Sequence, residues 1–128
     1  MKIPPIKVQP EMKRDMELIR EIVFAVEGED ENFLEHFQIE GYSIEKVAYH
    51  CYQLVQGGYA EGRVVNDMKN KRTIITNLTW EGHEFADLAR SQTVWQKTMK
   101  LVKDRSDTVG MGVLMQLLAA TAKSIFGL

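Results

Sequence analysis

The sequence has little cysteine, few prolines and no long apolar run. Its one cysteine, Cys51, excludes an intrachain disulfide and is typical of a protein in a reducing compartment. The longest apolar stretch, from Gly110 to Ala122, is interrupted by Gln116 and is shorter than the roughly 20 residues that span a bilayer. The N-terminus lacks the apolar core of a secretory signal. We therefore expect a cytoplasmic protein with no membrane segment.

The sequence also lacks the residue sets that carry known chemistry. It shows no nucleophile with a partner base, no phosphate-binding loop and no cluster of metal ligands. Its histidines, His36, His50 and His83, do not have the spacing of a known ligand set. Glu81 and Glu84 lie at the start of a predicted helix, where the positive end of the helix dipole stabilises acidic side chains and accounts for their presence without a catalytic role. These absences predict a protein that is not an enzyme and that uses no metal or cofactor.

The length and the charge set further bounds. A chain of 128 residues is long enough to bury one hydrophobic core and predicts one domain. A net charge of -2 argues against a general polyanion binder but leaves room for a local basic patch. All three prolines lie within the first ten residues, so residues 1–11 are predicted to form an extended arm.

Apolar residues recur at helical spacing after this arm. They are Met12, Met16, Ile19, Val23 and Val26. The spacing predicts an amphipathic helix from Met12 to about Gly28, with charged residues on its outer side. The segment that follows is acidic and has no helical stripe, so it predicts a loop and then a short strand from about His36 to Gly41.

A second helix begins after Ser43, whose hydroxyl can cap it. Its predicted buried face comprises Ile44, Val47, Ala48, Cys51, Leu54 and Val55. Gly57 and Gly58 end this helix through a left-handed cap. Two β-like runs follow, Tyr59 to Val65 and Lys71 to Leu78, and the polar segment between them predicts a hairpin.

The C-terminal part is predicted to be helical. Thr79 occupies an N-cap position, and apolar residues continue at helical spacing to about Lys103. A last helix from about Thr108 to Phe126 has a thin polar face, so packing or dimerisation must cover it. We therefore expect residues 12–105 to form one domain and residues 106–128 to add a C-terminal helix.

This order of elements predicts a mainly α protein with a small antiparallel β-sheet, in the winged helix-turn-helix arrangement. The segment YHCYQLVQGGY, from Tyr49 to Tyr59, resembles the end of the recognition helix in bacterial winged-helix regulators. The segment ITNLTWEGHEF, from Ile75 to Phe85, is similar to the end of the second wing strand and the start of the next helix in those proteins.

A longer resemblance extends from Met12 to about Ala122. MKRDMELIREIVFAVE, GYSIEKVAYHCYQLVQGGY and LTWEGHEFADLAR, with Trp95 downstream, resemble the family called domain of unknown function twenty-five thirteen. That family is widespread in bacteria and their phages. The resemblance implies a cytosolic bacterial or prophage protein with a winged-helix core, and it implies no ligand. The chain departs from the family in the arm before Met12 and in Cys51.

If this arrangement binds double-stranded DNA, two elements supply the contacts. The predicted recognition-helix residues are Ser43, Lys46, Tyr49, His50 and Gln53, with Lys46 and His50 as the main contacts. The predicted wing residues are Arg63, Lys69, Lys71 and Arg72. These four cations, against the two acids Glu61 and Asp67, can hold phosphates or enter a minor groove. The first functional hypothesis is therefore a homodimeric DNA-binding regulator, joined through its C-terminal helices.

The same residues allow a different interpretation. Cations at a hairpin tip also keep an exposed sheet edge soluble. The predicted recognition helix has one cation, Lys46, which Glu45 balances, and residues 28–42 carry five acids. Tyr49 and Tyr52 can pack on a protein, because aromatic residues are enriched in protein interfaces. The second hypothesis is therefore a winged-helix module that binds a protein and not DNA.

Overall fold

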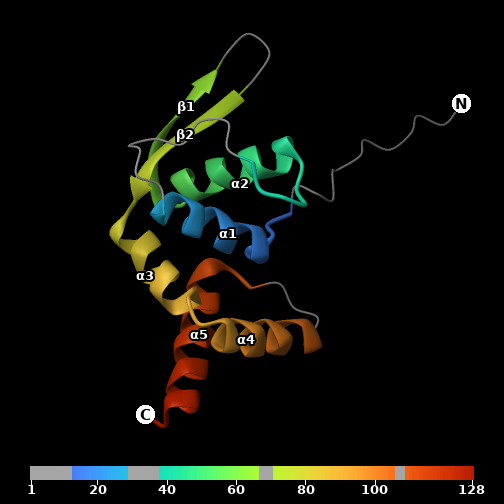
Figure 1. Cartoon of the computed structure of the whole chain (residues 1–128), viewed down its shortest axis with the longest axis vertical. Helices are drawn as coiled ribbons and strands as arrows, with labels where there is room; N and C mark the ends of the chain where they lie inside the picture. Colours follow the sequence, from blue (N-terminus) through green and yellow to red (C-terminus); the bar gives the residue numbers. More distant parts are fainter. Residues whose placement is uncertain (1–12, 29–37, 67–70, 106–108) are drawn as a thin grey trace, which may run out of the picture. The chain divides into compact units, whose positions relative to one another are not determined.

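The computed structural model describes residues 13–28, 38–66, 71–105 and 109–128 (Figure 1). Its elements are α1 (Met16–Glu27), α2 (Ile44–Gln56), β1 (Ala60–Asn66), β2 (Lys71–Leu78), α3 (Trp80–Ala89), α4 (Gln92–Asp104) and α5 (Met111–Phe126). Within these residues the protein is mainly helical with one two-stranded antiparallel sheet, which confirms the predicted fold class. The chain forms two compact units, Met1–Thr79 and Trp80–Leu128.

In the first unit, α1 and α2 pack on each other and on the hairpin of β1 and β2. The buried apolar residues of these elements include Leu18, Ile19, Ile22, Val23, Val47, Cys51, Leu54, Ile75 and Leu78. This order of helix, helix, paired glycines and hairpin is consistent with a winged-helix-like arrangement.

The first helix starts later than its apolar spacing predicted. Asp15 has an extended backbone, and its carboxylate accepts a hydrogen bond from the Leu18 N–H, so it is the N-cap of α1. The predicted start, Met12, lies outside the described residues. The predicted strand from His36 to Gly41 is wrong in its described part, because residues 38–41 contain no strand and residues 40–41 form a turn, closed by the Tyr42 N–H donating to the Ile39 carbonyl.

Both ends of α2 agree with the sequence prediction. The Ser43 hydroxyl accepts from the Lys46 N–H at 3.1 Å and caps the first turn. At the other end Gly58 adopts the left-handed conformation, with φ of 84°. The Tyr59 N–H then reaches back to the Leu54 carbonyl, and the Gly58 N–H reaches the Val55 carbonyl. These two bonds form a Schellman motif, which turns the chain from α2 directly into β1.

The hairpin contains a bulge close to its base. Glu61 pairs with Asn77 and Gly62 pairs with Ile75, so Thr76 is the extra residue on β2. The Thr76 hydroxyl donates to the Glu61 carbonyl and supports this irregular pairing. A Cβ atom at Gly62 would collide with the Ile74 carbonyl oxygen, so the close approach of the two strands requires glycine there.

The second unit consists of α3, α4 and α5, which pack on one another. The predicted single helix from Thr79 to Lys103 is wrong, because α3 ends at Ala89 and a separate helix, α4, begins at Gln92. Ser91 causes the restart, since its hydroxyl accepts from the Val94 N–H and caps α4. The last helix begins at Met111, with Gly110 as its N-cap.

Two aromatic rings form the centre of the second unit. Trp95 and Phe85 are fully buried, and their rings meet edge to face with centroids 6.2 Å apart. Leu114 and Leu118 of α5 are also buried. The hydroxyls of Thr98 and Thr121 lie 2.9 Å apart and join α4 to α5.

None of the helices described is long and apolar enough to cross a membrane.

Candidate nucleic-acid interface

The predicted recognition helix, α2, presents fewer ligand-binding groups than its sequence indicated. Ser43 is exposed, but its hydroxyl is used as the helix cap. Tyr49 and Gln53 are half-buried, so part of each side chain is accessible. Lys46 is the only Lys or Arg in α2, and its ammonium forms an ion pair with the Asp15 carboxylate at 3.1 Å.

The prediction that His50 faces solvent is wrong. Its side chain is 0% exposed and lies between α2 and the start of α1. The Asp15 backbone N–H donates to His50 Nε2 at 2.8 Å, and His50 Nδ1 lies 2.7 Å from the Lys46 carbonyl oxygen. Since a carbonyl can only accept, Nδ1 carries the proton and Nε2 is the acceptor. A buried ring with both nitrogens bonded in this way cannot contact a base edge.

Asp15, Lys46 and His50 therefore form one polar cluster, which we call the cap cluster. Asp15 caps α1 with one carboxylate oxygen, holds Lys46 with the other and donates its backbone N–H to His50. The Lys46 ammonium also lies 5.3 Å from the centre of the Tyr42 ring, a cation–π contact. The cluster fastens the start of α1 to the first turns of α2, and it pairs the one Lys or Arg of α2 with a carboxylate.

Burial and bonding shift the pKa values of this cluster. Desolvation lowers the pKa of His50 below its ordinary 6.5, despite the nearby Asp15 carboxylate. Desolvation alone would raise the pKa of Asp15, but hydrogen bonds from Lys46 and from the Leu18 N–H outweigh it and hold that pKa below 3.8. The folded protein therefore favours a neutral imidazole beside an ionised carboxylate.

This shift predicts that the protein loses stability in mild acid. Because the unfolded chain binds a proton at His50 more readily, the free energy of unfolding should fall once the pH drops below 6.5. The loss should stop growing below the lowered folded pKa of His50. Urea unfolding midpoints measured from about pH 7.5 to about pH 5 test this. His50→Leu should show a smaller pH dependence over the same range, and an unchanged one would contradict the assignment.

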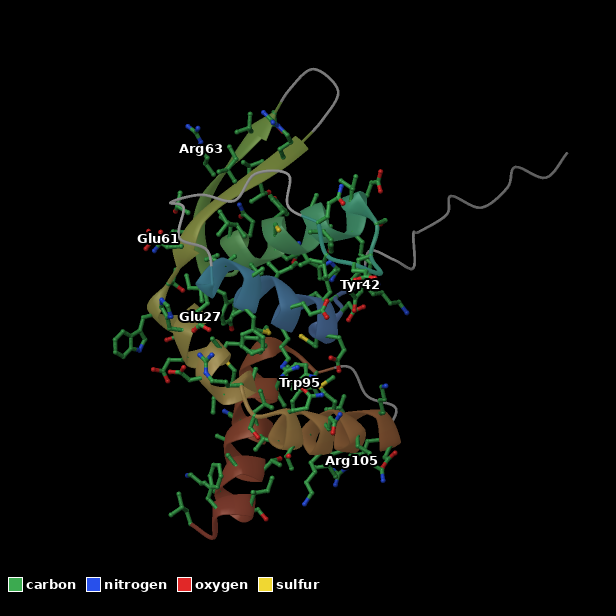
Figure 2. All side chains as sticks on the ribbon, in the orientation of Figure 1. Glu27, Tyr42, Glu61, Arg63, Trp95 and Arg105 are labelled. Atoms are coloured by element: carbon green, nitrogen blue, oxygen red, sulfur yellow. The ribbon has the colours of Figure 1, made fainter. Side chains whose placement is uncertain are left out.

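Two of the predicted wing residues, Arg63 and Arg72, have described side chains, and both lie on the hairpin. Arg63 is exposed and extends outward from β1 (Figure 2). Arg63 is opposite Ile74 and Val65 is opposite Arg72, so both arginines lie on the same face of the hairpin. Arg72 is half-buried. Lys69 and the side chain of Lys71 lie outside what the structure describes, although the backbone of Lys71 begins β2.

Residues that the sequence analysis did not assign to a site also lie on this unit. Ile44 was expected in the core but is 65% exposed at the start of α2, where it lines a shallow pocket with Tyr42. Asp15 was missed because the apolar spacing pointed to an earlier helix start. The signal that could have found it is local, since an Asp three residues before a helical N–H is a common cap.

Metal ligation and thiol chemistry are the other candidates among these residues. No group of three His, Cys, Asp or Glu side chains that could hold a metal ion is present in the described ranges. Burial raises the pKa of the Cys51 thiol to about 12, so this side chain stays protonated and packs as a small apolar residue.

The comparison with known proteins agrees with the resemblance noted in the sequence. Residues 13–108 match the family model described as "Hypothetical protein (DUF2513)". The chain belongs to the DUF2513 family. An uncharacterized protein of Haemophilus influenzae is 31% identical over 108 residues, which cover 83% of this chain and 92% of that protein. No solved structure shows a significant match. The DUF2513 match includes α1 to α4 and ends just before α5.

Proposed function

We propose that this DUF2513 protein is a non-catalytic DNA-binding regulator of bacterial or prophage origin. The observation that carries the proposal is the hairpin, which follows α2 directly through the paired glycines and has Arg63 and Arg72 on one face. Guanidinium groups on a protruding ribbon are suited to phosphates and to a narrow minor groove. Regulation would occur by blocking or recruiting other proteins at a promoter, without a chemical step.

The buried His50 and the paired Lys46 change the expected division of contacts. The arginines of the hairpin supply the main electrostatic attraction, because α2 offers no other Lys or Arg. Of the predicted contacts on α2, Tyr49 and Gln53 keep accessible parts that can meet a base edge, and an amide such as Gln53 can bind adenine with two hydrogen bonds. The net charge of -2 then confines binding to this local surface.

A homodimer is part of this proposal. Two copies related by a two-fold axis would present two hairpins and two α2 helices to half-sites about one helical turn apart. The C-terminal helices are the expected contact, since α5 exposes Val113 and Phe126 at its surface.

Removing both hairpin arginines tests the DNA-binding proposal. The variant Arg63→Ala/Arg72→Ala should bind pooled genomic DNA fragments about tenfold more weakly in a polarisation titration. Its affinity should also depend less on salt, with a slope of log K against log salt smaller by about two. The matched control is Arg105→Ala/Lys123→Ala, which removes two exposed cations from the second unit. Circular dichroism checks that each variant is folded.

The titration has three possible outcomes. A selective loss in the hairpin variant supports DNA binding through this face. An equal loss in both variants would show a non-specific charge effect, and wild-type protein that binds no fragment even at low salt would overturn the proposal.

A protein-binding module is the second candidate, and one observation favours it. The outer side of α2 combines the exposed Ile44 with the half-buried Tyr49 and Tyr52, and its one lysine is held by Asp15. Such a surface, apolar and aromatic with few charges, is typical of a protein interface. Absence of DNA binding, together with an effect of Ile44→Glu on capture of a partner protein, would favour this function.

A further inference from the structure

The second unit has a groove between α4 and α5 that nothing in the described residues covers. It has a volume of about 610 Å³. On the α4 side it is lined by Lys97, Lys100, Leu101 and Asp104, and on the α5 side by residues that include Leu117 and Ile125. Leu101 is 48% exposed and Ile125 is 37% exposed, so two large apolar side chains face water here.

The charges along α4 indicate what covers this groove. Lys97 and Asp104 are seven residues apart, which is about two helical turns or about 10 Å, and both face the groove with Leu101 between them. If α4 of a second copy lies antiparallel across a two-fold axis, Lys97 meets the partner's Asp104. The same axis makes Asp104 meet the partner's Lys97. The groove side of α4, with Lys97 at one end and Asp104 at the other, is therefore complementary in charge to an inverted copy of itself.

The remaining groove residues fit the same arrangement. Leu101 lies next to the axis, where it and Ile125 are removed from water by the second copy. Lys100, one residue from Leu101, can lay its methylene chain along the partner's Leu101 while its ammonium stays in solvent. Among the described residues neither Lys97 nor Asp104 forms an ion pair, so both can pair across the axis.

We propose that the α4–α5 groove is a homodimer interface, in which two antiparallel α4 helices are joined by reciprocal Lys97–Asp104 ion pairs around a centre formed by Leu101 and Ile125. This inference builds on the homodimer named in the proposed function and gives it a defined surface. It does not depend on DNA binding, and it places α4, together with α5, in the contact between the two copies.

A charge exchange tests the arrangement. Lys97→Glu and Asp104→Lys each replace two attractive contacts per dimer by two repulsive ones, so each should raise the dimer dissociation constant at least about tenfold. The double variant Lys97→Glu/Asp104→Lys restores both pairs with reversed sign and should return the constant to within about threefold of wild type. Sedimentation velocity of the full chain over a series of concentrations, without DNA, measures all four proteins.

Lys103→Glu is the matched control, because it makes the same charge change on the same helix at an exposed position outside the groove lining. It should dimerise like wild type. A wild-type chain that stays monomeric, or a double variant as weak as either single variant, would overturn the proposed interface. The first result would instead favour an acidic peptide as occupant, since Lys97 and Lys100 would then form a basic rim with no second copy to pair with.

The failure of this interface and the failure of DNA binding are distinguishable. A monomer that still binds genomic fragments would refute the interface and leave the DNA-binding proposal in place. A dimer that responds to the charge exchange but binds no fragment would refute DNA binding and leave the interface in place.

Discussion

Trp95→Ala is expected to lower the free energy of unfolding by about 3–5 kcal/mol, the range for removing a large buried aromatic ring. Trp95 is only 1% exposed, and its ring meets Phe85 edge to face at the centre of the second unit. The surrounding helices cannot close the space left by an indole without moving α4. Urea unfolding followed by far-ultraviolet circular dichroism measures the loss, because that signal does not depend on tryptophan fluorescence.

The sequence provides a matched control for this variant. Trp80 is 77% exposed at the start of α3, so Trp80→Ala should change the free energy of unfolding by no more than about 0.5 kcal/mol. Equal losses in the two variants would contradict the assignment of Trp95 to the core and of Trp80 to the surface.

His50→Leu is expected to lower the free energy of unfolding by about 2–4 kcal/mol, because it leaves two part-buried backbone groups without their partner. The Asp15 N–H loses its acceptor and the Lys46 carbonyl loses its donor. Leucine is apolar and of similar size, so lost packing explains little of the change. Thermal or urea unfolding above pH 7 isolates this effect from the protonation of the imidazole.

His83→Leu serves as the control, since His83 is an exposed histidine in the second unit and its replacement should change the free energy of unfolding by no more than about 0.5 kcal/mol.

A second measurement separates a structural role of His50 from a DNA-contacting one. Under conditions where His50→Leu remains folded, its affinity for genomic fragments should equal that of wild type. A selective loss of DNA affinity with unchanged stability would restore His50 to the interface and contradict the cap cluster.

The Ser43 cap, the glycine-terminated α2 and the hairpin were all predictable from the sequence, because each depends on residues close together in the chain. A serine hydroxyl three residues before the N–H that it caps, and a glycine that adopts positive φ, specify their geometry locally. The β-branched residues of β2 identify a strand in the same way. These features also place Arg63 and Arg72 on one hairpin, which carries the proposed function.

The break between α3 and α4 had a local signal that the apolar spacing concealed. Phe85, Leu88, Gln92 and Trp95 keep helical spacing through the break, so the pattern predicted one continuous helix. Ser91 starts a new helix within that pattern, and periodicity alone cannot distinguish a capped restart from continuation.

Short-range backbone chemistry and apolar spacing specify α2 with its two caps, the hairpin and the family, so these features could be predicted from the sequence. The contacts of His50 and Lys46 depend on tertiary packing, because their partner Asp15 lies 35 and 31 residues earlier in the chain. A histidine on a helix is polar whether it meets DNA or a buried backbone N–H. Which of these it meets depends on how α1 packs against α2, and the spacing of residues along α2 contains no information about that contact.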